Sequence, residues 1–220
     1  MSDIIYRIKW DQWIILAACA NLENMFGFFW EEPKMTQRKM ALQLYQMVKR
    51  DMLEVKKGKI VPKGEYAKIM SCIQDTKCML LLEKRGRVDT KQGILYLGKA
   101  RCVWVSKDKQ AKRMLQVCLI DYNDWMEMLR GEMYFPVFQS SCKEEWEKVE
   151  CFPKKEQCSF YLAVKNAEQE KWEMAVLEQK GRLLLIEKMG EQIKQTTYKQ
   201  GFLLEKLQKI EEEEIVCMYM

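Results

Sequence analysis

Hydrophobic residues in the first part of the chain recur at helical spacing. Residues 11–20 place their apolar side chains on one face, which predicts a first helix. Thr36 has the side chain of a good N-cap, and the apolar positions after it predict a second helix. The run 64–85 repeats the same spacing, so we expect one long helix that ends near Gly86.

A short hairpin is predicted between the second and third of these helices. Two brief apolar segments, 52–55 and 60–62, flank the turn Lys56-Lys57-Gly58-Lys59. The order helix, helix, hairpin is typical of a winged-helix region. We therefore predict a helical, winged-helix-like N-terminal region over residues 1–86.

The hydrophobic pattern changes to a period of two after residue 92. Two series of strands are predicted, each followed by a helix. The first series comprises 94–97, 101–105 and 114–120, and the second comprises 160–164, 172–177, 183–186 and 193–197. We expect an α+β fold in which an antiparallel sheet with flanking helices follows the N-terminal region, in two quasi-repeated strand-strand-strand-helix halves. This region spans 87–220, either as a second domain or continuous with the first.

The composition argues against most enzyme mechanisms. Among 220 residues there is no histidine, the side chain that most often acts as a general base or metal ligand near neutral pH. Neither a Gly-x-Gly-x-x-Gly nor a P-loop phosphate motif is present. We expect a non-catalytic protein that needs no cofactor and no metal.

Cysteine usage and hydropathy indicate a location inside the cell. None of the nine cysteines forms a Cys-x-x-Cys pair, and an odd number indicates reduced thiols. The N-terminus has no secretory signal, and no apolar run approaches the ~20 residues that a membrane span requires. We therefore predict a cytoplasmic protein that does not insert into a membrane.

Basic residues concentrate in the segment 34–63, which has nine basic and two acidic side chains and a net charge of +7. A basic helix followed by a basic wing could neutralise DNA phosphates. A solvated basic face on a structural winged helix explains the same charges. A nucleic-acid-binding transcriptional regulator is therefore the alternative function.

Two of the predicted strands are apolar at successive positions rather than at alternate ones. These strands lie at 102–105 and 160–164, so both faces of the sheet there need a cover. Helices can cover one face, and either a loop of the chain or a partner protein covers the other. Large aromatic side chains in the strands and in the loop 139–157 are the candidate partner-binding residues. They are Trp104, Trp146, Phe152, Phe160 and Trp172.

Four long stretches resemble the EspG-type chaperones of ESX (type VII) secretion, in the divergent form found in Gram-positive firmicutes. The stretches are WDQWIILAACANLENMFGF, ALQLYQMVKRDMLEVKKGKIVPKGEYAKIMSCIQDTKCMLLL, LYLGKARCVWV with MLQVCLIDYNDWMEML, and MAVLEQKGRLLLIEKMGEQIKQTTYKQGFLLEKL. Together they cover nearly the whole chain. They are patterns of apolar residues and turns without a catalytic signature.

The resemblance implies a cytosolic adaptor with a central antiparallel sheet and flanking helical subdomains. Proteins of this family bind the helical tip of a secretion substrate and cover its apolar end until delivery. No individual site residue can be transferred, because no motif for one is present. The sequence leaves open the identity of the partner, the oligomeric state, and whether the strands form one sheet or two.

Overall fold

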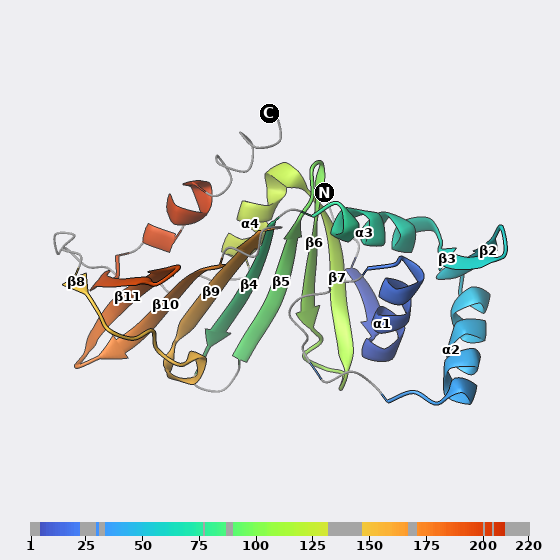
Figure 1. Cartoon of the computed structure of the whole chain (residues 1–220), viewed down its shortest axis with the longest axis horizontal. Helices are drawn as coiled ribbons and strands as arrows, with labels where there is room; N and C mark the ends of the chain where they lie inside the picture. Colours follow the sequence, from blue (N-terminus) through green and yellow to red (C-terminus); the bar gives the residue numbers. More distant parts are fainter. Residues whose placement is uncertain are drawn as a thin grey trace. The chain divides into compact units, whose positions relative to one another are not determined.

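The computed structural model describes residues 5–22, 30, 34–76, 78–86, 90–131, 147–166, 171–199, 201–203 and 205–209. The chain packs as two compact units that alternate along the sequence. Figure 1 labels the helices and strands. Unit 1 comprises Met1–Thr76 and Tyr96–Tyr122, and unit 2 comprises Lys77–Leu95 and Asn123–Met220. The regions 1–86 and 87–220 inferred from the sequence, as two domains or as one continuous domain, stay a prediction. Strands and helices occur in both units, and the predicted α+β class with antiparallel strand pairing is confirmed.

Unit 1 contains three strands of a sheet, a separate hairpin and three helices. Its elements in chain order are β1 (Ile5–Lys9), α1 (Trp10–Cys19), α2 (Gln37–Lys49), β2 (Leu53–Lys56), β3 (Lys59–Pro62), α3 (Gly64–Gln74), β6 (Arg101–Lys107) and β7 (Met114–Asp121). The sheet order is β1-β7-β6, and β7 is antiparallel to both neighbours. β1 was not predicted, because Ile8 is its one buried residue and the strand has no clear apolar alternation.

Local signals in the sequence placed the ends of several elements correctly. The Thr36 hydroxyl accepts a hydrogen bond from the backbone N–H of Lys39, at 3.3 Å, and so caps α2. Between β2 and β3, Lys57 and Gly58 have φ values of 49° and 74°. Two successive residues with positive φ give the turn whose twist matches that of a hairpin. The order α1, α2, β2–β3 matches the predicted helix, helix and hairpin, whereas a winged-helix function stays a prediction.

The long helix predicted over residues 64–85 is wrong in its second half. α3 ends at Gln74, and residues 78–85 form strand β4 (Cys78–Arg85). The Thr76 hydroxyl donates to the Cys72 carbonyl at 2.8 Å and satisfies a backbone acceptor at the helix end. The run Met79-Leu80-Leu81-Leu82 is apolar at every position, so periodicity alone cannot separate a helix from a strand covered on both faces.

Unit 2 is a sheet with helical elements from α4 and from the C-terminal part of the chain. Its strands pair in the order β5-β4-β9-β10-β11-β12-β8. β5 (Thr90–Leu97) contributes residues 90–95 to unit 2 and its last residues to unit 1. The other strands are β8 (Glu147–Lys148), β9 (Phe160–Asn166), β10 (Lys171–Gln179), β11 (Arg182–Met189) and β12 (Gln192–Thr197). The helical elements are α4 (Trp125–Gly131) and the residues 202–203 and 205–209, which we call the C-terminal helix. Short 3-10 turns lie at Tyr122–Asp124 and Lys155–Gln157.

One face of the unit 2 sheet is covered by the C-terminal helix. This face contains Phe160 and Leu185, both fully buried, and the carboxylate of Glu187. The Lys206 ammonium in that helix lies 3.0 Å from Oε1 of Glu187, so the helix lies over this face. Its Phe202, Leu203 and Leu207 are buried.

The opposite face is covered, at Tyr161, by the chain's own loop before β9. Tyr161 and Cys158 belong to a buried cluster against which Phe152 packs. The Phe152 and Tyr161 rings meet edge to face, with centroids 6.4 Å apart. The Lys155 ammonium lies 4.5 Å from the centroid of the Tyr161 ring. The need for a second cover, inferred from the sequence, is therefore met here by a loop.

Candidate functional site

Exposed apolar side chains concentrate on α2 in unit 1. Although α2 has 13 residues, Met47 alone is buried in it. Leu42, Tyr45 and Val48 are 56%, 66% and 37% exposed. Residues three apart on a helix are neighbours on its surface, so these three side chains form a stripe that faces away from the core. A helix in a soluble domain normally turns such a stripe inward.

The β2–β3 hairpin, which contacts α2, has two further exposed apolar side chains. Val55 and Ile60 are direct partners across the hairpin and are 67% and 36% exposed. They lie on the same face of the hairpin as Leu53, which is 1% exposed, so this face is core at its base and exposed at its tip. α2 packs beside β2, as Figure 1 shows. We call the exposed side chains of Leu42, Tyr45, Val48, Val55 and Ile60 the α2–hairpin surface.

The concentration of these side chains is unusual for the described part of the chain. Only two other large apolar side chains described there are similarly exposed, Ile5 and Met189. Single exposed apolar residues are common in soluble proteins, whereas a group on neighbouring elements usually marks an interaction site.

Cations surround the α2–hairpin surface. The basic residues of segment 34–63 are exposed, apart from the half-buried Lys63. Lys39 pairs with Asp11 at 3.2 Å, and Lys63 pairs with Asp51 at 2.6 Å. Within the described residues, seven further cations make no ion pair; these are Lys34, Arg38, Lys49, Arg50, Lys56, Lys57 and Lys59. This surface therefore carries a positive charge that the described part of unit 1 does not neutralise.

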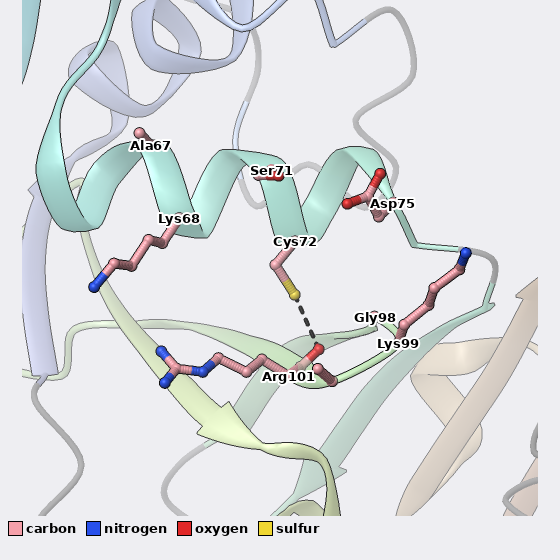
Figure 2. Close-up of a pocket in the computed structure, with 9 residues that line it drawn as sticks. Ala67, Lys68, Ser71, Cys72, Asp75, Gly98, Lys99 and Arg101 are labelled. Atoms are coloured by element: carbon pink, nitrogen blue, oxygen red, sulfur yellow. Dashed lines mark hydrogen bonds between the residues drawn. The ribbon is translucent and has the colours of Figure 1, made fainter.

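A hollow of about 540 Å³ lies elsewhere in unit 1, between α3 and the turn that joins β5 to β6 (Figure 2). It is lined by Ala67, Lys68, Ser71, Cys72, Asp75, Gly98, Lys99, Ala100 and Arg101. The Cys72 thiol donates to the Arg101 carbonyl at 3.0 Å. The turn approaches α3 so closely at Gly98 that a Cβ there would lie 2.8 Å from the Cys72 sulfur. Only glycine fits this contact without a shift of the backbone.

The cysteine in the lining of this hollow is a poor nucleophile at neutral pH. Burial raises the pKa of the Cys72 thiol to about 11, so the thiol stays protonated at neutral pH. Lys68 pairs with Glu65 at 2.6 Å, and Arg101 pairs with Asp121 at 3.5 Å. Two of the three cations in the lining are therefore paired with carboxylates. We interpret the hollow as part of the structural contact between α3 and the turn rather than as a ligand site.

Two carboxylates are buried in the described part of unit 2, and both have partners that explain their burial. Glu173 accepts a hydrogen bond from the Tyr161 hydroxyl at 2.5 Å. Burial raises the pKa of Tyr161 above its ordinary value, and the Glu173 carboxylate raises it further. Glu187 accepts from Trp172 Nε1 at 2.9 Å and from Lys206. These bonds tie strands and helix together, as buried charges require.

Four of the partner-binding residues predicted from the sequence lie within the described part of the chain, and those in unit 2 do not share one face of its sheet. Trp104 lies on β6 in unit 1 and is 6% exposed, while Phe160 on β9 is 0% exposed. Trp172 on β10 is half-buried and bonded to Glu187. Phe152 packs on Tyr161, the neighbour of Phe160, and side chains of neighbouring strand residues point to opposite faces. Phe152 and Phe160 therefore lie on opposite faces of the unit 2 sheet.

Trp146 lies outside the described residues, and the role of all five aromatic residues in partner binding stays a prediction. The sequence analysis did not identify the α2–hairpin surface. A signal was present, because apolar residues of the second helix occur on more than one face. Met47 points inward, whereas Leu42 and Tyr45 point outward. A helix of this kind needs a second contact besides its own core.

Within the described residues, no group of three or more metal-ligating side chains is found. Helices long and apolar enough to cross a membrane are likewise missing from that part of the chain.

Comparison with known proteins finds a similarity in structure and none in sequence. No protein-family profile and no curated protein sequence matches the chain. Among solved structures, the chain is similar to the type VII secretion system chaperone EspG5 of Mycobacterium tuberculosis, solved in complex with the PE25-PPE41 dimer. The match has a TM-score of 0.53 and 9% sequence identity, and it covers 88% of this chain and 90% of EspG5. The chain therefore has a fold like that of a secretion chaperone.

Proposed function

We propose that the chain is a non-catalytic, protein-binding chaperone or adaptor and that its partner is a helical substrate of a type VII (ESX-like) secretion system. The α2–hairpin surface is the observation that carries this proposal. Apolar side chains that remain in water lose the free energy that burial would give, about 25 cal/mol for each Å². Their exposure on two neighbouring elements is accounted for if a second polypeptide covers them.

The fold supports a chaperone-like, protein-binding role for the chain. EspG5 has a similar fold over most of both chains and is described as a chaperone bound to a protein dimer. Function resides in sites rather than in folds, so the likeness makes protein binding the first hypothesis and does not identify the substrate. The substrate class in our proposal rests on the sequence resemblance together with this fold. A cytoplasmic location likewise stays a prediction.

Co-expression with the products of the neighbouring genes tests the proposal. We expect one of them to form a stable complex that remains intact during size-exclusion chromatography. In the variant L42S/Y45S/V55S we expect at least a tenfold loss of affinity, because the interface loses three apolar side chains. The matched control is I5S/M189S, which removes side chains of similar exposure outside the α2–hairpin surface.

The outcomes separate protein binding from the alternative. Loss of the complex in L42S/Y45S/V55S with retention in I5S/M189S supports the proposal. Failure of the unmodified chain to bind any of these proteins overturns it. Tight, salt-sensitive binding of duplex DNA would instead favour the nucleic-acid-binding regulator. The apolar centre of the exposed α2 face weighs against that role, because base-edge and phosphate contacts in DNA readers come mainly from polar side chains.

A further inference from the structure

On the outward side of α2, two apolar side chains lie between two basic ones. Arg38, Leu42, Tyr45 and Lys49 follow one another at spacings of four, three and four residues. This spacing places all four side chains along one line on the helix surface. All four are exposed. The line therefore has an apolar centre and a cation at each end.

The hairpin beside α2 adds an apolar pair on one face and cations on its other face and in its turn. Val55 and Ile60 provide an exposed apolar pair, and Lys56 and Lys59 form the next pair toward the turn. Lys57 adds a third cation within the turn itself. On α2 the exposed apolar side chains thus lie between cations on the same face, and these cations have no acidic partner among the described residues.

We infer that the α2–hairpin surface binds an amphipathic helix of a partner protein whose apolar face is bordered by Asp and Glu side chains. This inference rests on the proposed protein-binding function and specifies the chemistry of the partner. α2 has 13 residues, which corresponds to about 20 Å at 1.5 Å per residue, so a partner helix of about four turns matches its length. Acidic side chains beside the partner's apolar stripe would meet Arg38 and Lys49 at the two ends.

Charge also decides between this occupant and a second copy of the chain. In a symmetric dimer the same patch meets itself, so two segments that each carry +7 would face one another. Like charges brought together at an interface weaken association. An acidic helix removes this repulsion and covers the same apolar side chains.

Two synthetic helical peptides with identical apolar positions test the inference. One carries Glu at the positions that border the apolar stripe, and the other carries Lys at those positions. Binding of each peptide to the full chain is measured by fluorescence anisotropy at 50 and 300 mM salt. We expect the Glu peptide to bind at least tenfold more tightly than the Lys peptide and to weaken as salt rises.

Charge-reversed variants assign this preference to the surface. In R38E/K49E we expect the Glu peptide to lose at least tenfold in affinity and the Lys peptide to gain. The control K148E/R182E makes the same change in net charge at two exposed residues of unit 2 and should keep the original preference. Circular dichroism confirms that each variant is folded, and the milder R38Q/K49Q replaces R38E/K49E if reversal disturbs the fold.

Several results would overturn the inference. Equal affinity for the two peptides would do so, as would an equal loss of affinity for the Glu peptide in K148E/R182E and R38E/K49E. Displacement of the Glu peptide by duplex DNA would point to a nucleic acid as the occupant. A dimer of the chain that dissociates in L42S/Y45S/V55S would point to a second copy. If a natural partner binds the unmodified chain but neither peptide does, the inference fails and the proposed function stands. If the Glu peptide binds as expected but no neighbouring protein does, the proposed substrate class fails instead.

Discussion

The ammonium of Lys206, in the C-terminal helix, lies 3.0 Å from Oε1 of Glu187, near the end of β11. Glu187 is 4% exposed, and its other oxygen lies 3.1 Å from the ammonium of Lys194. Burial raises the pKa of this carboxyl group, but hydrogen bonds from Lys206, Lys194 and Trp172 outweigh burial and hold it below the ordinary value of 4.5. The ionised form of Glu187 therefore connects two strands and a helix.

We predict that E187Q destabilises the chain by about 2 kcal/mol at pH 7, because charged hydrogen bonds contribute more than neutral ones. A carboxylate whose pKa is lowered by folding stabilises the fold above its unfolded pKa, and this stability is lost as pH falls through the folded pKa. The difference between the two proteins should therefore shrink below about pH 4.5. Urea unfolding at pH 7 and at pH 4 measures it. The exposed carboxylate substitution E178Q is the control, and a difference that does not depend on pH would contradict this account.

Gly98 gives a second prediction, which concerns the contact between α3 and the turn after β5. A Cβ at this position would lie 2.7 Å from the Arg101 carbonyl oxygen and 2.8 Å from the Cys72 sulfur. Moving a backbone carbonyl oxygen requires a shift of the main chain, so we expect G98A to lower the free energy of unfolding by about 1–3 kcal/mol. Adding C72A should recover only part of the loss, because it relieves only the contact with sulfur.

The control for this prediction is G131A at the end of α4, where a Cβ would meet nothing within 4 Å. Alanine favours a helix over glycine by up to about 1 kcal/mol, so this variant should be neutral or slightly stabilising. Thermal denaturation of the three variants measures the effects. Equal melting temperatures for G98A and the unmodified chain would show that the turn can move away from α3.

Caps, turns and hydrophobic periodicity predicted many of the helices and strands. The elements that were predicted wrongly depend on packing between residues that are distant in sequence. The Thr36 cap and the Lys57-Gly58 turn depend on nearby residues, and both are confirmed. β4 was predicted as helix because an apolar run at 79–82 suits either structure, and its pairing with β9 decides the outcome. Tertiary partners of this kind are distant in sequence and leave no local pattern.

The candidate site was harder to predict than the fold for a related reason. Large aromatic residues such as Trp104 and Phe160 were chosen because aromatic side chains are common in interfaces, but the same residues also fill cores. Which apolar residues stay exposed depends on what packs over them. Tyr45 and Val55 do not differ in type from core residues, and only the fold shows that nothing in the described chain covers them.

Phe152 distinguishes a loop that covers the sheet from a loop that binds a partner. Because its ring packs on Tyr161, we predict that F152A lowers the free energy of unfolding by about 1–3 kcal/mol, less than for a fully buried Phe. F152L retains most of the apolar volume and should lose less than half as much. Urea unfolding and partner affinity are measured for both variants. Unchanged stability with weaker partner binding would instead make Phe152 a contact residue.

The cysteines that the structure describes should differ widely in reactivity. Burial raises the pKa values of Cys72 and Cys158 to about 11, and the Cys158 thiol also donates to the Lys154 carbonyl at 3.3 Å. At pH 8 such a thiol is ionised in about one molecule in a thousand, and only the thiolate reacts with iodoacetamide. Cys151 is exposed.

We therefore predict that brief alkylation at pH 8 labels Cys151 at least tenfold faster than Cys72 or Cys158. Peptide mass spectrometry after timed quenching measures the three rates separately. The rates at Cys72 and Cys158 should rise steeply between pH 8 and pH 10, because each pH unit increases the thiolate fraction about tenfold below the pKa. Labelling in denaturant gives the reference rate for each cysteine, because burial then neither raises the thiol pKa nor blocks access of the reagent. Rapid labelling of Cys72 in the folded chain would show that the thiol is not held between α3 and the turn at Gly98.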